Sequence, residues 1–356
     1  MININDFLLK LSLIVVNIFI NIFIFKFKNL NNSYFKFENF LINKNSTINK
    51  FYSYKEKQYC SENNKQMINI SFSLNNNLIY QTLVVMTSVL ENNDNQKHYI
   101  VFYLLLSHDF DEKNIQIFES LKLKYQLNIN YYYIPNLFKS LIKWRNSYAN
   151  YYKLIIPILL PNIKKILHLD GDTLVFKDLG ELFNLPFNDN YYLAQPTRNY
   201  IFKDKKMTKR VVNVGVILIN IEKIRKDNKD FELLYYLFKK KFTEQLAINY
   251  VCLPKIGYLP FKYGIFAKIH KKNYTYQNYL KMKLDKKVNI TEVIEAIKDP
   301  SIVHAVNCKP KHWFKINKII DIATYEACVK IQNLFYYYAK KTNYYQIIYN
   351  KFMKNI

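Results

Sequence analysis

Two aspartates separated by one glycine, Asp170 and Asp172, directly follow the apolar residues 166–169. An apolar run of this length predicts a buried strand, which places both acids at its carboxyl end, the edge where open α/β sheets bind ligands. Residues two apart in an extended segment point the same way, and Gly171 lets the backbone approach a ligand closely. The two carboxylates can therefore bind one hard divalent cation. Because Asp-Gly is also a common turn pair, a surface turn is the simpler alternative.

Three other polar residues lie in or beside apolar stretches and are candidates for the same site. Asn213 lies inside the apolar residues 211–219, and a polar group buried in a strand must find a partner, either a ligand or a neighbouring loop. His304 follows two β-branched residues, a setting in which a single histidine often has a structural role. Since Lys309 follows closely, His304 is also a candidate metal ligand beside a phosphate-binding cation.

Strand-like and helix-like patterns alternate on both sides of Asp170. This alternation predicts an α/β fold with a mostly parallel sheet and helices on both faces, as in nucleotide-binding domains. The chain contains neither GxxxxGKS/T nor GxGxxG, which argues against P-loop and dinucleotide-binding folds. Apolar runs predict strands at residues 67–73, 99–106, 127–134, 166–169, 191–195 and 211–219. Helical spacing predicts helices at residues 79–90, 111–125, 148–160 and 230–252, the last with a second half from Thr243.

The composition describes a large, basic, globular protein. Half of the 356 residues are hydrophobic, including 32 Tyr and 26 Phe, which excludes a disordered chain. The formal net charge is +25, but the lysines are scattered along the chain and no nucleic-acid-binding module is visible, so we expect no nucleic-acid partner. The charge favours anionic partners such as a phosphorylated substrate or an acidic membrane surface. The four cysteines form no CxxC pair, so neither a zinc site nor a disulfide framework is indicated.

The first residues predict a membrane anchor. Residues 7–25 are apolar except for four polar side chains, and about 20 apolar residues span a bilayer. Small residues typical of a cleavage site are missing at its end, which favours an uncleaved single-pass anchor over a cleaved signal peptide. The protein would then lie in the Golgi or ER lumen of a eukaryote or in a bacterial envelope membrane. The expected organisation is an anchor at 1–28, a stem at 29–66, a globular domain at 67–313 and a basic helical tail at 314–356, which packs on the domain or lies on a membrane surface.

Several motifs, taken in order, resemble glycosyltransferase family 8, which includes glycogenin-like enzymes and bacterial lipopolysaccharide glucosyl- and galactosyltransferases. The resemblance covers roughly residues 67–313 and implies a GT-A type fold. It also implies a UDP-sugar donor, a glycan, lipid or protein acceptor, Mn²⁺ with Mg²⁺ as the alternative, and transfer of a hexose, glucose or galactose, with retention of configuration. The motifs are residues 88–93, residues 149–172 with Asp170 and Asp172, Asn213-x-Gly215-Val216, Glu244-Gln245, Leu259-Pro260, and His304 to Trp313.

The resemblance assigns one set of residues to the metal and another to the diphosphate. Asp170, Asp172 and His304 would hold the cation, which neutralises the charge that develops on the diphosphate leaving group. Lys309 would give the diphosphate a second positive contact. Lys311 takes that place if the register shifts.

The same resemblance assigns the remaining site residues. Gln245 lies at the position beside the anomeric carbon, and Glu244 is its neighbour on the acceptor side. The residues assigned to donor binding are Asn75 and Asn77 for the nucleoside, Lys153 and Asn213 for the donor sugar or diphosphate, and Gly171 for the close approach of the backbone.

Some positions depart from the family pattern. Asn75 stands where an acid is usual, Lys153 replaces an arginine, and Leu246 follows Glu244-Gln245 where a second acid is usual. These departures leave open a second function, that of an inactive, membrane-tethered protein that binds a UDP-sugar. A third alternative is a haloacid-dehalogenase-like phosphatase, in which the first aspartate of a similar motif is the nucleophile. It is disfavoured because three predicted strands precede Asp170 and because Leu174 stands where that motif has Thr or Val.

Overall fold

The computed structural model describes residues 63–143, 146–202, 207–266, 290–306, 311–315 and 322–354. The expected anchor, nearly all of the expected stem and Lys309 lie outside these residues. Among the helices of the described ranges, none combines the length and the apolar character that a bilayer crossing requires.

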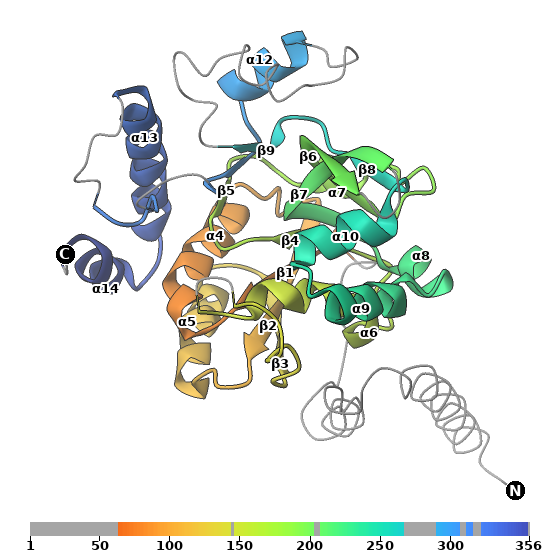
Figure 1. The fold of residues 1–356 in the computed structure, drawn as a ribbon. Coiled ribbons are helices and arrows are strands. Elements are labelled where there is room, and N and C mark those ends of the chain that lie inside the picture. The colour runs from red at the N-terminus through yellow and green to blue at the C-terminus, as the bar shows by residue number, and fades with distance from the viewer. Residues whose placement is uncertain are drawn as a thin grey trace, which may run out of the picture. The chain divides into compact units, whose positions relative to one another are not determined.

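Within the described residues, a seven-stranded sheet forms the centre of the fold in the order β3-β2-β1-β4-β7-β6-β8 (Figure 1). Strands β3, β2, β1 and β4 are parallel, β7 is antiparallel to both of its neighbours, and β6 and β8 are again parallel. The prediction of a mostly parallel α/β sheet is therefore confirmed. The strands are β1 Gln66–Leu74, β2 His98–Ser107, β3 Leu127–Ile134, β4 Lys165–Leu169, β6 Tyr192–Phe202, β7 Met207–Asn220 and β8 Ile256–Tyr258.

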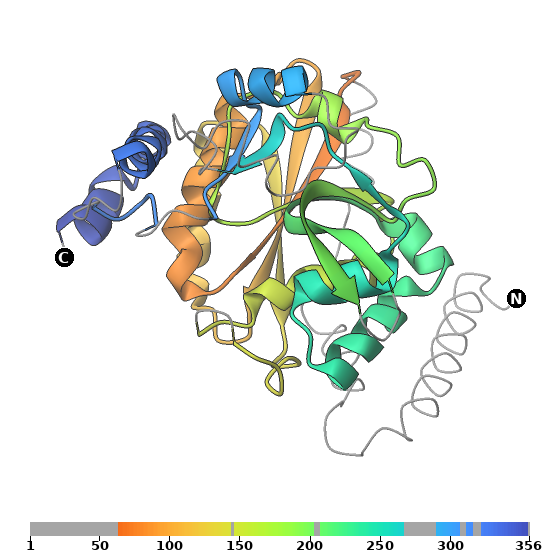
Figure 2. The ribbon, with the colours of Figure 1, turned by 45° about the horizontal axis from the view of Figure 1, so that its top comes forward.

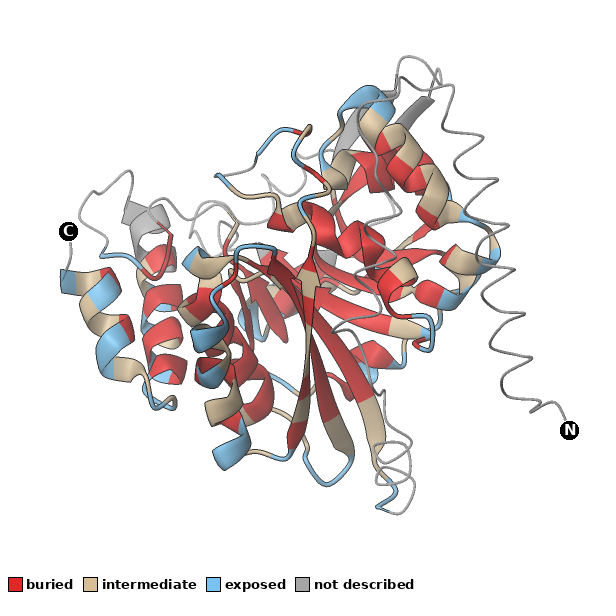
Figure 3. Cartoon of the chain, turned by 90° about the horizontal axis from the view of Figure 1, so that it is seen from below, coloured by how far each residue is buried: buried red, intermediate tan, exposed pale blue. Residues whose placement is uncertain are grey.

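Helices cover both faces of this sheet (Figure 2). Consecutive residues of β1 and β2 are buried, as expected for parallel strands whose two faces are both covered, and Figure 3 shows this burial along the central strands. The α-helices are α4 Ile79–Glu91, α5 Ile115–Glu119, α6 Ile156–Leu159, α7 Gly180–Phe183, α8 Ile221–Lys226, α9 Lys229–Lys240, α10 Glu244–Cys252, α12 Ile290–Lys298, α13 Ile322–Ala339 and α14 Tyr345–Tyr349.

Three expected helices differ from the prediction. Residues 111–125 form the 3₁₀ helix Glu112–Asn114, the short helix α5 and the 3₁₀ helix Ser120–Leu123. Residues 148–160 form a 3₁₀ helix, η5 (Ala149–Ile155), which continues as the short helix α6. Residues 230–252 form two helices, because Lys241 adopts a left-handed conformation that ends α9 and the Thr243 side chain caps the start of α10. The apolar periodicity continues through each of these predicted helices and does not show where the helix type changes. Only the residues of the turn at 241–243 mark a boundary, the one between α9 and α10.

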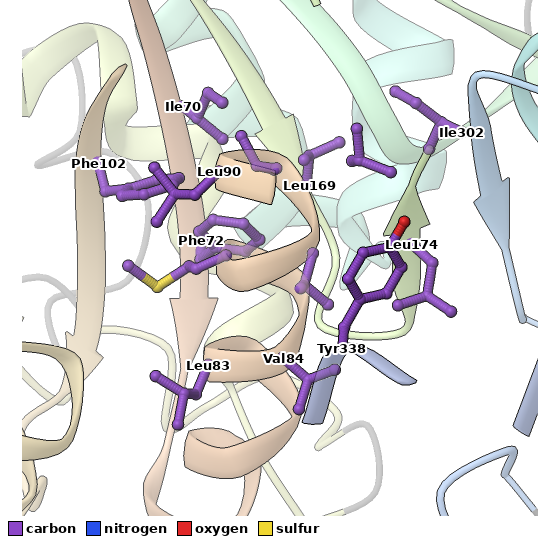
Figure 4. Close-up of a cluster of buried hydrophobic side chains, with 14 of the residues drawn as sticks. Ile70, Phe72, Leu83, Val84, Leu90, Phe102, Leu169, Leu174, Ile302 and Tyr338 are labelled. Atoms are coloured by element: carbon purple, nitrogen blue, oxygen red, sulfur yellow. The ribbon is translucent and has the colours of Figure 1, made fainter. Parts of the chain in front are cut away.

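A second sheet of three strands, β5 (Thr173–Val175), β10 (Ile302–His304) and β9 (Tyr263–Phe266), packs against the first through the main core. Figure 4 shows where β1, β2, β4, α4, β5, β10 and α13 meet. The Tyr338 hydroxyl of α13 accepts a hydrogen bond from Asn92 Nδ2 at 2.8 Å, and Phe335 is fully buried. The described part of the C-terminal segment therefore packs on the domain.

Asp230 in α9 is a buried acid whose titration should affect stability. Only 4% of the residue is exposed, and burial raises its pKa to about 6. The folded carboxyl thus contributes stability at acid pH that is lost as the pH rises from the unfolded pKa, about 3.9, through 6. We expect Asp230→Asn to raise the free energy of unfolding by about 2 kcal/mol at pH 8, with a gain that vanishes toward pH 4.

Urea unfolding at several pH values would measure this effect. Asp299→Asn is the control. Because the Asp299 side chain is 72% exposed, this substitution should leave the free energy of unfolding of the protein unchanged. A gain for Asp230→Asn that is equal at pH 4 and pH 8 would contradict a raised carboxyl pKa.

Candidate active site

The acidic pair lies in a tight turn at the carboxyl end of β4. The Asp170 N–H donates to the Gly215 carbonyl of β7 at 2.8 Å. The Asp170 carbonyl accepts from the Thr173 N–H at 3.1 Å and from Thr173 Oγ1 at 2.9 Å. The two acids therefore lie in a turn, as the simpler alternative predicted, and this turn also borders a cavity, which keeps the prediction of a cation site open.

Asp170, Asp172 and His304 form a three-residue cluster. Each offers one ligand atom, and these atoms lie within 4.8 Å of one another. His304 Nε2 lies 3.0 Å from Asp172 Oδ1 and 3.9 Å from Asp170 Oδ2. The pairing of β10 with β5 brings the histidine there, because His304 lies opposite Thr173, the residue after Asp172.

Two lysines hold the other oxygens of the two acids. Lys153 Nζ donates to Asp170 Oδ1 at 2.8 Å and to the Val214 carbonyl at 3.1 Å. Lys311 Nζ donates to Asp172 Oδ2 and to the Ala305 carbonyl. The Oδ2 atom of Asp170 and the Oδ1 atom of Asp172 therefore remain on the side of His304.

This donor set fits a divalent cation. Two carboxylate oxygens and one imidazole nitrogen suit Mn²⁺ or Mg²⁺ and leave positions for ligand oxygens. The backbone of Gly215 closes the site so tightly that a Cβ there would lie 2.7 Å from Asp170 Oδ2 and 2.1 Å from His304 Cε1. Only glycine leaves room for the acid and the imidazole in these positions.

The surrounding charges keep both acids ionised. Burial raises the pKa of each carboxyl, but the charge of Lys153 and the hydrogen bond of His168 beside Asp170, and His304 and Lys311 beside Asp172, hold both pKa values well below the usual range. The site can therefore present two negative charges to a cation at any physiological pH.

His168 lies beneath Asp170 and was not predicted as a site residue. It is fully buried in β4, with Nδ1 3.0 Å from Ser71 Oγ and Nε2 3.4 Å from Asp170 Oδ1. Burial, together with the charge of Lys153, lowers its pKa to about 4, so its imidazole is neutral at pH 7. The position of His168 inside the otherwise apolar residues 166–169 is the sequence feature that could have identified it as a site residue.

The cavity has a volume of about 550 Å³. Among the residues predicted for the site, Lys153 lies under Asp170 rather than in the wall, and Lys309 falls outside the described residues. The predicted residues in the wall are Asn75, Asn77, Asp170, Gly171, Asp172, Asn213, Glu244, Gln245, His304 and Lys311.

One wall of the cavity is the start of α10. Asn213 Nδ2 donates to Gln245 Oε1 at 3.3 Å, while Asn213 Oδ1 accepts from the Gly215 N–H. Glu244 accepts from Asn150 Nδ2 at 2.5 Å. Burial raises the pKa of Glu244, although Lys153 and Asn150 oppose the shift. Asn213 thus binds a neighbouring side chain and borders the cavity at once.

Sequence reasoning missed several wall residues. Lys351 and Phe352 come from the C-terminal segment, and Trp313 and Phe314 precede that segment. No local pattern marks these side chains as site residues, because packing of distant helices alone brings them to the cavity.

The strand order and the acidic turn at the edge of β4 define a GT-A-like α/β fold. A sequence profile described as glycosyl transferase family 8 matches residues 69–317, and the chain belongs to this family. A Haemophilus influenzae protein whose name gives it as a candidate glycosyltransferase is 26% identical over 211 residues. That alignment covers 54% of this chain and 62% of the relative.

Two solved structures share the fold. The bifunctional glycosyltransferase WbbM superposes with a TM-score of 0.63 at 17% identity, covering 80% of this chain and 52% of WbbM. The galactosyltransferase LgtC, solved with donor and acceptor sugar analogues, gives 0.59 at 18% identity, covering 78% of this chain and 96% of LgtC. This chain therefore matches only part of the length of WbbM and of the Haemophilus relative.

Lys153 should contribute to stability through its ion pair. The residue is 3% exposed, and Lys153→Met would leave Asp170 and the Val214 carbonyl without their donor. We expect a loss of about 1–2 kcal/mol in the free energy of unfolding, because the lysine is buried but the Asp170 side chain is 38% exposed, so that solvent screens part of the attraction.

Urea unfolding in the presence of a chelator measures this loss. Lys164→Met is the matched control, because the Lys164 and Glu222 side chains are 77% and 58% exposed and such surface pairs contribute little. Equal stability of the two variants would show that the buried ammonium is not needed by Asp170.

Proposed function

We propose that this family-8 protein is a retaining hexosyltransferase that transfers glucose or galactose from a UDP-sugar to a glycan, lipid or protein acceptor. The observation that carries the proposal is the convergence of Asp170, Asp172 and His304 at a cavity that Gln245 also borders. The retaining outcome and the hexose follow from the family resemblance.

We assign separate parts of the cavity to the cation with the diphosphate and to the nucleoside. Asp170, Asp172 and His304 would hold Mn²⁺ or Mg²⁺, which when bound neutralises charge on the diphosphate leaving group. Lys311 would orient Asp172 in the described site, while Lys309 remains the proposed diphosphate contact. Asn75 accepts a hydrogen bond from the Asn77 N–H and so shapes the turn after β1, where we place the nucleoside.

Gln245 and Glu244 would border the reacting sugar. Asn213 holds the Gln245 side chain, which we place beside the anomeric carbon. Burial raises the pKa of Glu244, which we place on the acceptor side of the cavity. Gly171 leaves the backbone open toward the donor.

We further propose that residues 1–28 anchor the protein in a membrane of the secretory pathway or the bacterial envelope. The support is the apolar stretch 7–25 in the sequence. Extraction of membranes with alkaline carbonate tests this proposal. An anchored chain stays in the pellet, and release of the full-length chain into the supernatant would contradict it.

UDP release by the purified full-length protein tests the enzymatic function. The protein is incubated with a panel of UDP-sugars and candidate acceptors, with Mn²⁺ or with EDTA. We expect UDP release from one donor that EDTA abolishes. Tight Mn²⁺-dependent UDP binding without turnover would instead favour the inactive UDP-sugar-binding protein, and release of inorganic phosphate would favour a phosphatase. Absence of UDP binding would overturn the proposal.

A further inference from the structure

The C-terminal segment, residues 322–354, forms part of the cavity wall. It consists of α13, α14 and the π-helix η8 (Asn350–Lys354), and it begins beyond residue 317, where the family match ends. Lys351 and Phe352 of η8 line the same cavity as Asp170 and Asp172. Side chains that lie beyond the family match therefore border the same cavity as the family region.

Packing holds this segment firmly against the family region. Phe352 is 2% exposed and its ring meets that of Phe314 edge-on at 5.5 Å. The Tyr336 hydroxyl of α13 donates to the Trp313 carbonyl at 2.7 Å, and Gln332 Nε2 donates to the Phe314 carbonyl. Burial of Phe352 holds the backbone of the adjacent Lys351 beside the cavity, while the Lys351 side chain is exposed to solvent.

Lys351 lies at the end of the cavity formed by the loop after β1. Its Nζ atom is 5.0 Å from the centre of the Tyr80 ring. Tyr80 is in the first turn of α4 and follows Asn77 and Leu78, which both line the cavity. The ammonium group therefore lies at the end of the cavity where the proposed function places the nucleoside, and a diphosphate would extend from that end toward the acidic pair in the same cavity.

The charge of Lys351 is not balanced by the protein. Lys153 and Lys311 are paired with Asp170 and Asp172, whereas Lys351 forms no ion pair with any carboxylate in the described ranges. Lys351 is exposed to solvent, and the neighbouring side chains remove enough water to lower the pKa of its ammonium group. An anion bound in the cavity would supply an ion-pair partner.

We propose that Lys351 is a donor-binding residue whose ammonium group pairs with the diphosphate of the nucleotide. The C-terminal segment is then part of the donor site rather than a separate tail. This inference rests on the proposed function, since it requires a nucleoside diphosphate in the cavity.

Titration of the full-length protein with UDP in the presence of Mn²⁺ tests the proposal. We expect Lys351→Gln to weaken UDP binding about 10-fold or more, as for loss of one charge-assisted hydrogen bond. Lys351→Arg should bind within about 3-fold of the wild type, because it keeps the charge. The matched control is Lys354→Gln, which removes an exposed lysine of the same helix that does not line the cavity. The difference between wild type and Lys351→Gln should shrink as the salt concentration rises.

The outcomes separate this inference from the proposed function. If the wild type binds UDP and Lys351→Gln binds it equally well, the inference is overturned and the proposed function stands. If the wild type does not bind UDP, the proposed function itself fails. Uridine competition distinguishes the two parts of the ligand, since an equal loss for uridine would place Lys351 on the nucleoside and overturn the diphosphate contact.

Discussion

Asp172→Asn is expected to lower Mn²⁺-dependent UDP release on the order of 1,000-fold while the protein stays folded. Asp172 offers one oxygen to the ligand cluster and holds Lys311 with the other. Asparagine keeps the shape of the side chain but removes its negative charge. Lys311 then faces the cavity without its counter-charge, so the site both binds the cation less tightly and repels it.

The rate of UDP release and the Mn²⁺ affinity are measured together for this variant. Asp299→Asn serves as the control, since it makes the same chemical change in an ion pair with Lys177 at the surface. We expect Asp299→Asn to match the wild type in both measurements. Asp172→Asn with Mn²⁺ affinity and activity within 10-fold of the wild type would show that the acidic pair does not bind the cation.

Gly215→Ala is expected to weaken Mn²⁺ binding about 100-fold through geometry alone. The added Cβ would lie 2.1 Å from His304 Cε1 and 2.7 Å from Asp170 Oδ2, far inside contact distance. His304 is 2% exposed, so its ring has little room to retreat. Either the imidazole or the carboxylate must leave the cluster, and overpacking should also lower the free energy of unfolding by about 1–3 kcal/mol.

Gly171→Ala is the control for this change. Its Cβ would meet Thr82 Oγ1 at 3.4 Å, an ordinary contact, and should leave folding and Mn²⁺ affinity close to those of the wild type. Calorimetric titration with Mn²⁺ measures the affinity without relying on turnover. Mn²⁺ affinity of Gly215→Ala equal to that of Gly171→Ala would argue that His304 and Asp170 do not act together on the cation.

Local pattern was sufficient to predict six of the seven strands of the main sheet and the acidic pair, but not β8 or the antiparallel direction of β7. The strands that bracket Asp170 are short apolar runs, and parallel topology places the residues after them at one edge. Residues 127–134 and the observed β3 even share their bounds. The acids at 170 and 172 follow from this rule, because they come directly after a buried strand, whereas Asn75 was assigned to the site by the family resemblance.

The rest of the site depends on contacts that local pattern does not contain. His304 reaches Asp172 through the β10–β5 pairing; its neighbours in the sequence made it a candidate ligand, but only the family resemblance joined it to Asp170 and Asp172. Lys153 was expected to touch the donor, yet its 3₁₀ helix directs it under Asp170. No sequence pattern marked Lys351 as a site residue, since the packing of α13 and η8 on the domain determines its position.

The pairing of each acid with a lysine also determines how this protein should respond to loss of its metal. In many metal sites the ligands repel one another until the ion arrives, and binding then drives folding. Here the ammonium groups of Lys153 and Lys311 act as built-in counter-ions. When the metal binds, the two carboxylates exchange part of their attraction to the lysines for attraction to the cation, and the fold is already complete. A chelator should therefore stop catalysis reversibly without unfolding the chain.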